Sequence, residues 1–165
     1  MRSFLTTALF LIFFFSCTGE NATQYNDSII KPQLEIVAYM DSIFSPETNY
    51  EEIVEYRQKM VNSADRGWES IGRLGDFRGN DSFRNAGEEY YSYVRNYFGT
   101  TEGMDSLMFK FNSPEGIETL SEEAYLETQE SFKKFLELEN NLLSEQQRFA
   151  VEFNLKMDYR PNETP

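Results

Sequence analysis

The sequence predicts an all-α protein, specifically an antiparallel up-down-up-down four-helix bundle with an aromatic-rich core. Apolar residues recur at spacings of three and four along four long stretches of the 165-residue chain, as on the buried face of an amphipathic helix. Residues that start and stop helices separate these stretches, and short loops favour antiparallel neighbours. Aromatic residues make up 16% of the chain, so their rings are expected to fill much of the core.

The first stretch runs from Asn21 to Phe44. Its apolar positions keep a helical spacing: Tyr25, Ile29, Ile30, Leu34, Val37, Met40, Ile43 and Phe44. Pro32 lies inside the stretch and cannot donate a backbone hydrogen bond to the carbonyl of Ser28. The helix therefore either bends at Pro32 or begins near Lys31, and the apolar period before Pro32 favours the bend.

Two start signals precede the second stretch. Ser45 can cap a helix that has Pro46 at its first position, and Thr48 can form a capping box with Glu51. The apolar positions that follow are Tyr50, Val54, Met60, Val61, Ala64, Trp68, Ile71 and Leu74. We expect this helix to end at Gly75 in the left-handed conformation that commonly closes a helix.

The third stretch runs from Ser82 to about Asn112, after a polar turn in which Asn80 or Asp81 can act as the cap. Its apolar positions are Phe83, Ala86, Tyr90, Val94, Tyr97, Met104, Leu107, Met108 and Phe111. Poor helix formers gather from Gly99 onward. The pattern therefore predicts either one helix kinked near Gly99 or two shorter helices that meet there.

The last stretch follows a loop predicted over residues 113–116. Ser121, or Thr119 paired with Glu122, can open a helix that runs from Glu122 to about Met157. Its apolar positions are Tyr125, Phe132, Phe135, Leu136, Leu142, Leu143, Phe149, Phe153 and Met157. At about 1.5 Å per residue this helix would be over about 50 Å long. The polar residues 158–165 are expected to form a disordered tail.

The start of the chain has the layout of a secretory signal. Arg2 precedes an apolar run from Phe4 to Phe15, which is too short to span a bilayer, and Ser16 and Cys17 follow. A small residue before the only cysteine resembles the lipobox of bacterial lipoproteins. This resemblance implies that the signal peptide is cut before Cys17 and that the Cys17 sulfur carries a lipid. A secreted protein cut nearby and an uncleaved anchor are the alternatives.

The predicted organisation is a signal peptide at 1–16, a lipidated tether at 17–21, a four-helix bundle at 22–157 and a tail at 158–165. Thr18, rather than an aspartate, follows the cysteine, which for a lipoprotein indicates the outer membrane and leaves its periplasmic or surface face open. The segment YNDSIIKPQ at 25–33 resembles small uncharacterised helical surface lipoproteins of spirochaetes and Bacteroides-type bacteria. That resemblance implies a lipid-anchored helical domain and supplies no catalytic residue.

Composition excludes several function classes. The formal net charge is −13; without residues 1–16, which carry Arg2 and no acid, it becomes 14 − 28, or −14. Nucleic acid and anionic membrane surfaces repel such a chain. Histidine is absent and the one cysteine is assigned to the lipid, which removes the common zinc ligands and the His-dependent nucleophile systems. We therefore expect no metal, no cofactor and no catalytic residue.

Carboxylates spaced for one helix face are the first candidate for chemistry. They are Glu51 with Glu55, Glu123 with Glu127, and Glu88 and Glu89 beside Tyr90. Most of these acids flank the apolar positions, so a solvated helix face is the favoured interpretation. Two carboxylates suffice for glycoside hydrolysis, but the spacing singles out no pair.

Arginines concentrated around the turn between the second and third helices are the second candidate: Arg66, Arg73, Arg78, Arg84 and Arg95. The aromatic residues beside them are Trp68, Phe77, Phe83, Tyr90 and Tyr91. Exposed rings and guanidinium groups can together bind an anionic group or a sugar. The candidate ligand-binding residues are Trp68, Arg73, Arg78 and Arg84. In the alternative interpretation these arginines pair with nearby acids: Glu69, Asp76, Asp81, Glu88 and Glu89.

Glycines form the third candidate. Gly72, Gly75 and Gly79 lack the lysine that a phosphate-binding loop requires, so nucleotide binding is set aside. Gly67 and Gly72 are expected instead to let a neighbouring helix come close.

These observations favour a non-catalytic binding or scaffolding domain, anchored to the cell envelope by the lipid on Cys17, with a protein or an anionic glycan as ligand and no nucleic acid. The main alternative is an acidic inhibitor or immunity lipoprotein that captures a basic enzyme. The weaker alternative is a carboxylate-dependent glycan hydrolase.

Overall fold

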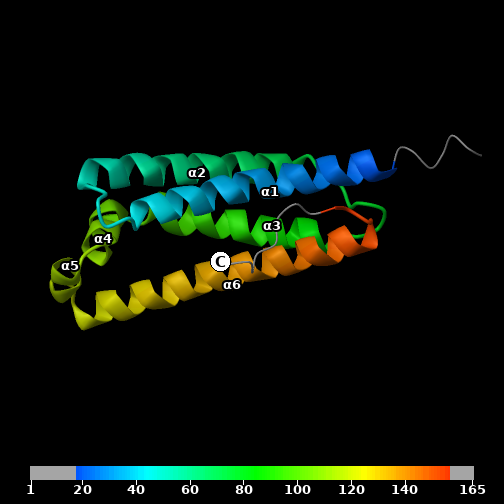
Figure 1. Ribbon diagram of the computed structural model, residues 1–165. Helices are drawn as coiled ribbons and strands as arrows, with labels where there is room; N and C mark the ends of the chain where they lie inside the picture. The colour runs from blue at the N-terminus through cyan, green and yellow to red at the C-terminus, as the bar shows by residue number, and fades with distance from the viewer. Residues whose placement is uncertain (1–17, 157–165) are drawn as a thin grey trace, which may run out of the picture.

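The computed structural model describes residues 18–156 and confirms the all-α class. In this range α1 (Thr18–Ile43) lies beside α2 (Tyr50–Gly72), and α3 (Ser82–Tyr93) lies beside α6 (Glu122–Glu152) (Figure 1). A π-helical segment, η1 (Val94–Phe98), continues α3. The short helices α4 (Met104–Phe111) and α5 (Pro114–Glu118) lie together at one end of the molecule. The signal peptide predicted at 1–16, Cys17, Met157 and the tail predicted at 158–165 lie outside the described residues.

Helix α1 is continuous through Pro32, so a start near Lys31 is wrong. It begins at Thr18, and the residues expected to form a tether after Cys17 are therefore helical. The buried face of α1 differs from the predicted apolar face at one position. Leu34 is 48% exposed, whereas the side chain of Ile36 is completely buried.

The start of α2 differs from the prediction by one residue. Asn49, not Thr48, is the N-cap: its side chain accepts a hydrogen bond from the Glu52 backbone N–H at 3.0 Å, and the Glu52 carboxylate accepts one from the Asn49 N–H at 2.9 Å. The Thr48 hydroxyl instead donates to the carbonyl of Ser42 at 2.7 Å. Along α2, Ile53 is completely buried, whereas Val54, predicted for the apolar face, is 36% exposed.

The predicted end of α2 at a left-handed Gly75 is wrong. The helix ends at Gly72, and its C-cap, Arg73, is right-handed with φ −93°. The left-handed residues of this connection are Arg78 (φ 55°) and Gly79 (φ 85°). They form a tight reversal in which the backbones of Phe77 and Asn80 hydrogen-bond to each other.

The prediction of one continuous helix from Ser82 to Asn112 is also wrong. The alternative prediction, two shorter helices, describes this part of the chain. The break falls at Gly103 (φ 74°) rather than at Gly99. Arg57 of α2 holds the two parts together, because it donates to the Phe98 carbonyl at 2.8 Å and pairs with Asp105 of α4. Both side chains of that ion pair are mostly buried.

The segment 113–116, predicted as a loop, opens α5. Ser113 is the N-cap of this helix and accepts a hydrogen bond from the Gly116 N–H at 3.0 Å, with Pro114 at the first position. Proline is preorganised for that position because its fixed φ suits a helix and its missing N–H would have no partner there.

Helix α6 begins as predicted, with Ser121 capping the Ala124 N–H at 3.2 Å. It ends at Glu152, before the predicted Met157, so its 31 residues span about 46 Å. Asn154 (φ 54°) reverses the chain, and the Leu155 N–H donates back to the Ala150 carbonyl at 2.8 Å. This is the Schellman arrangement, which satisfies the last carbonyls of a helix.

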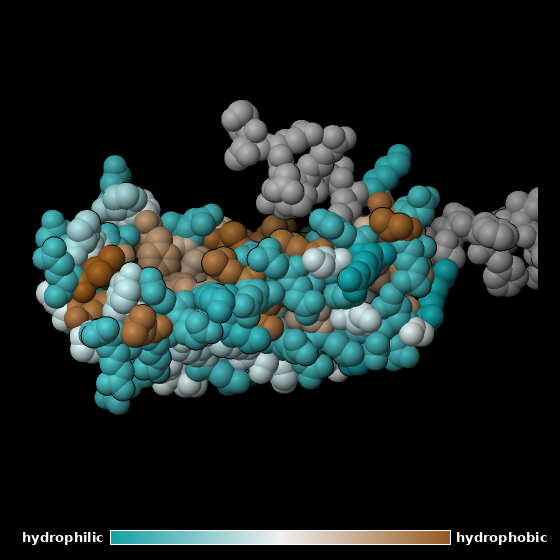
Figure 2. Space-filling view, turned by 90° about the horizontal axis from the view of Figure 1, so that it is seen from below, coloured by the Kyte–Doolittle hydropathy of each residue, from teal (hydrophilic) through white to brown (hydrophobic). Residues whose placement is uncertain are grey.

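The core is rich in aromatic rings, as predicted. At one end Phe149 packs against Tyr25, Phe77 and Phe83 with ring centroids 5.2–5.3 Å apart. Nearer the other end Phe98 packs against Phe132 and Phe135. Figure 2 views the molecule from the α6 side and shows a mainly hydrophilic surface broken by apolar patches. Exposed apolar residues of α6 are Leu126, Leu136 and Val151.

Two glycines permit close helix packing. A Cβ on Gly67 of α2 would lie 2.5 Å from the Tyr91 ring of α3, and a Cβ on Gly87 would lie 2.6 Å from the Ile71 side chain. The predicted close approach is thus confirmed for Gly67. For Gly72 it is wrong, because no neighbouring atom lies within 4 Å of its added Cβ.

Candidate functional site

A surface depression between α2 and α3, which we call the α2–α3 groove, has two adjoining parts. The outer hollow, of about 420 Å³, is lined by Trp68, Asn85, Glu88, Glu89 and Ser92. The inner hollow, of about 130 Å³, is more enclosed and is lined by Trp68, Ile71, Gly72, Arg84 and Glu88. Trp68 and Glu88 line both parts, so the two hollows form one candidate site.

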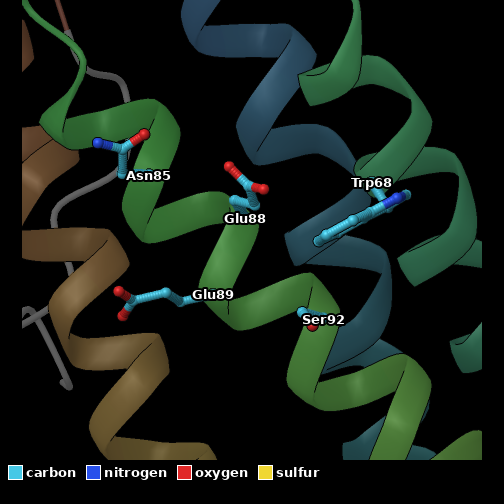
Figure 3. A pocket seen from close by; sticks show the side chains of 5 residues that line it. All are labelled: Trp68, Asn85, Glu88, Glu89 and Ser92. Carbon is cyan, nitrogen blue, oxygen red and sulfur yellow. The ribbon is translucent and has the colours of Figure 1, made fainter.

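Helix geometry gathers the polar side chains of this groove. Arg84 and Glu88 are four residues apart on α3, as are Asn85 and Glu89, so each pair shares one side of the helix. In Figure 3 Trp68 extends from α2 toward α3, Glu88 points into the space between them, and Glu89 points toward α6. The groove therefore combines an indole surface with carboxylate, amide and hydroxyl groups.

Trp68 is held in place on one side by Arg95. The guanidinium carbon of Arg95 lies 5.2 Å from the centre of the indole ring, and its Nε donates to the carboxylate of Asp65. A cation placed over the face of an aromatic ring is attracted electrostatically by the ring. The Asp65–Arg95–Trp68 contact thus orients the indole, whose remaining surface lines both hollows.

Arg84 has unused hydrogen-bonding capacity. One of its terminal nitrogens, Nη2, donates to the Asn85 side-chain oxygen at 3.0 Å. Its Nε–H is buried and has no acceptor. No carboxylate of residues 18–156 forms an ion pair with Arg84. A buried donor without a partner costs about 1–3 kcal/mol, so this guanidinium is the group in the groove that most needs an acceptor.

The structure brings together two of the four predicted ligand-binding residues. Trp68 and Arg84 share the inner hollow. Arg73 instead pairs with Glu69 at 3.3 Å on the open surface, and the guanidinium carbon of Arg78 lies 5.6 Å from the centre of the Phe77 ring. Neither Arg73 nor Arg78 lines the α2–α3 groove.

The alternative interpretation, in which the arginines pair with nearby acids, holds only in part. Of the five expected acids only Glu69 forms an ion pair with an arginine among the described residues. Arg66 pairs with Glu35 of α1, and Arg95 pairs with Asp65. Neither acid was predicted as a partner from the sequence, because each lies about thirty residues from the arginine it pairs with.

Asn85 and Ser92 also line the groove but were not among the residues predicted from the sequence. The signal was available in their spacing: Asn85, Glu88 and Ser92 follow each other at intervals of three and four, which places them on one face of a helix. Only the packing of α2 against α3 places Trp68 beside that face.

A second polar cluster lies inside the bundle. The Gln33 amide of α1 donates to the Glu139 carboxylate of α6 at 2.9 Å, while the Gln33 carbonyl oxygen and the Tyr90 hydroxyl are buried without partners. Burial raises the pKa of Glu139; the Gln33 hydrogen bond opposes this rise, and the charge of Asp41 adds to it. Burial, together with the negative charge of Glu139, also raises the pKa of Tyr90. This cluster links α1, α3 and α6.

Metal binding and membrane crossing receive no support from the described part of the chain. Within residues 18–156 no group of three or more His, Cys, Asp or Glu side chains is arranged to hold a metal ion. None of the helices there is long and apolar enough to cross a membrane. Comparison of the chain with protein-family models, curated protein sequences and solved structures finds no match.

Proposed function

We propose that this protein is a lipid-anchored cell-envelope protein, held in the outer membrane through Cys17, whose helical domain is a non-catalytic binding module. The ligand binds in the α2–α3 groove. The observation that carries this proposal is Arg84, which lines the inner hollow beside Trp68 with a buried Nε–H that has no acceptor. Sites that bind small molecules combine apolar surface with a few such polar groups.

The protein carries its own reporter for this proposal. Trp68 is the only tryptophan in the chain and lines both hollows. We expect its fluorescence to change saturably when the protein is titrated with a ligand of the groove. The titration panel comprises neutral, anionic and cationic oligosaccharides and short neutral peptides.

The matched control is Arg73→Gln, because Arg73 lies outside the groove in an exposed ion pair. Arg84→Gln should weaken the fluorescence response to the ligand, whereas Arg73→Gln should leave it unchanged. A panel that leaves Trp68 fluorescence unchanged throughout would remove the support for a binding module.

The lipid anchor has a separate test. Cys17 follows an apolar signal and is the only cysteine, so Cys17→Ala should move the protein out of the membrane fraction and remove the mass of the lipid. A Cys17→Ala protein that stays in the membrane fraction with unchanged mass would refute lipidation at this position. This result would leave ligand binding in the groove untouched.

A second candidate function is supported by charge. The net charge is −13, and α6 presents exposed carboxylates at Glu122, Glu123, Glu127, Glu130 and Glu137. Such a surface attracts a basic enzyme and speeds the encounter, so the protein would act as an inhibitor or immunity lipoprotein. Capture of a basic enzyme should weaken steeply as salt is raised, and capture that is indifferent to salt would contradict this function.

Glycan hydrolysis is the weaker candidate. Glu88 and Glu89 line the outer hollow next to each other on α3, and two carboxylates are the minimum for this reaction. A turnover assay on cell-wall oligosaccharides with wild-type and Glu88→Gln protein decides between binding and hydrolysis. Product formation that requires Glu88 would replace the binding module with an enzyme.

A further inference from the structure

We propose that the ligand of the α2–α3 groove is a neutral glycan that carries an N-acetylated amino sugar. This inference rests on the proposed binding function and specifies the class of ligand. It departs from the anionic glycan expected from the arginine-rich sequence, because only Arg84 of the arginines that suggested that ligand lines the groove.

The charges around the groove select against an anionic ligand. Arg84 is the only cation that lines either hollow, whereas Glu88 lines both and Glu89 lines the outer one. An anionic sugar would therefore meet one positive group, two carboxylates and a chain of net charge −13. Like charges across an interface are unfavourable and lower the rate of encounter.

A cationic ligand is disfavoured by Arg84. A positive group in the inner hollow would meet the Glu88 carboxylate, but it would also lie beside the Arg84 guanidinium, which forms no ion pair with the described carboxylates. It would also leave the Nε–H of Arg84 without an acceptor, since a cation offers none. The remaining class is a neutral ligand that presents an acceptor oxygen.

An amide carbonyl supplies that acceptor. The guanidinium has five N–H donors in a planar fork, and the described contacts use only one terminal nitrogen, toward Asn85. A carbonyl oxygen in the inner hollow could accept from this fork, and the buried Nε–H would become available to it only if the side chain rotates. The methyl group of an acetamido substituent would then lie near Ile71 and Trp68, the apolar residues of the same hollow.

The outer hollow fits the rest of a sugar. Sugar hydroxyls can donate to the carboxylate of Glu88 and the amide oxygen of Asn85, and Ser92 can either donate or accept; the Glu89 carboxylate, at the margin of the hollow, is turned toward α6 (Figure 3). The indole of Trp68 offers a broad apolar surface for the carbon face of a pyranose ring. A neutral peptide offers the same carbonyl but lacks this row of hydroxyls, so we assign the groove to the amino sugar.

The test is a set of calorimetric titrations of the protein with four disaccharides and one dipeptide amide of similar size. The probes are N,N′-diacetylchitobiose, cellobiose, the deacetylated cationic disaccharide and a uronic acid disaccharide, with a neutral dipeptide amide as the fifth comparison. We expect N,N′-diacetylchitobiose to bind, and cellobiose to bind roughly tenfold more weakly because it lacks the carbonyl that Arg84 needs. The charged disaccharides should bind more weakly still.

Variants locate the interaction. Arg84→Gln should remove most of the preference for N,N′-diacetylchitobiose over cellobiose, while Arg73→Gln should keep it. Thermal unfolding of each variant shows whether it is folded, and the selectivity of the wild-type protein is informative even if Arg84→Gln is unstable.

Three results would overturn this inference. Tighter binding of the uronic acid disaccharide, of the cationic disaccharide or of the dipeptide amide would overturn the ligand class while leaving the groove as a binding site. Equal binding of cellobiose and N,N′-diacetylchitobiose would remove the assigned role of the acetamido group. Absence of binding by every probe class would overturn both the inference and the proposed function.

Discussion

The backbone of α2 at Gly67 lies directly against the ring of Tyr91 on α3, so that a Cβ at this position would be 2.5 Å from the ring. The ring cannot easily move away, because Tyr91 is fully buried and its hydroxyl donates to the Ile29 carbonyl of α1. This contact fixes the separation of α2 and α3, and with it the width of the α2–α3 groove.

The first prediction follows from this contact. Gly67→Ala should lower the free energy of unfolding by about 1–3 kcal/mol, because it overpacks a core in which the tyrosine is pinned. Gly72→Ala is the matched control: an added Cβ there meets no atom within 4 Å, so the variant should be unchanged or stabilised by about 0.5–1 kcal/mol. Chemical denaturation measures both, and equal effects of the two substitutions would contradict the packing described.

The second prediction compares adjacent tyrosines. Both are buried, but the Tyr91 hydroxyl donates to the Ile29 carbonyl and the Tyr90 hydroxyl has no partner. Tyr91→Phe should therefore lower the free energy of unfolding by about 1 kcal/mol, whereas Tyr90→Phe should be neutral or stabilising because it removes an unpaired buried hydroxyl. A clear loss of stability in Tyr90→Phe would show that this hydroxyl has a partner in solution.

The third prediction concerns pH. Burial raises the pKa of Glu139 above its ordinary value of 4.5, so between that value and the raised one the folded protein holds more protons than the unfolded chain. The contribution of Glu139 to stability is therefore fully present below about pH 4.5 and is lost as pH rises through the folded pKa. Glu139→Gln, which can still accept the Gln33 hydrogen bond, should be more stable than wild type at about pH 7.

The advantage of Glu139→Gln should shrink as the pH is lowered toward the ordinary pKa of the carboxyl group. Thermal unfolding of both proteins across this pH range measures the difference in their stabilities. The contributions of the other carboxylates cancel in this difference because both proteins share them. A difference between the two proteins that does not vary with pH would contradict the raised pKa of Glu139.

The fourth prediction concerns the break between η1 and α4. Arg57 spans it by donating to the Phe98 carbonyl and to Asp105, with only 17% of its side chain exposed. Arg57→Lys keeps the charge but loses the two-pronged geometry, and it should lower the free energy of unfolding by about 1–3 kcal/mol. Arg73→Lys, in an exposed pair, should change it by less than about 1 kcal/mol; similar losses in both variants would count against this role of Arg57.

Much of the fold follows from patterns along the chain. The helical class, the aromatic core and the Ser121 cap of α6 are local properties of the sequence, and all are confirmed. The errors lie at boundaries. Thr48 and Asn49 are both good caps and both precede a glutamate by three residues, so the pattern along the chain does not decide between them. In the structure the Thr48 hydroxyl donates to the Ser42 carbonyl of α1, and Asn49 is the cap.

The candidate site was predictable only in part. The sequence places Trp68 and Arg84 near one turn. It does not show that other arginines of the same cluster, Arg66 and Arg95, are engaged in ion pairs between helices. Arg66 reaches Glu35 of α1, which lies 31 residues earlier in the chain. Such pairs depend on how the helices are arranged, as does the contact of Trp68 with the face of α3.

The α2–α3 groove as a binding site is tested most directly at the indole N–H of Trp68. As the only tryptophan, it gives a single indole cross-peak in a ¹H–¹⁵N correlation spectrum, and no assignment is needed to follow it. On titration with N,N′-diacetylchitobiose we predict that this cross-peak shifts saturably in wild-type protein and in Arg73→Gln, and far less in Arg84→Gln. An indole cross-peak that stays in place while other signals shift would put the ligand elsewhere and contradict the groove as the binding site.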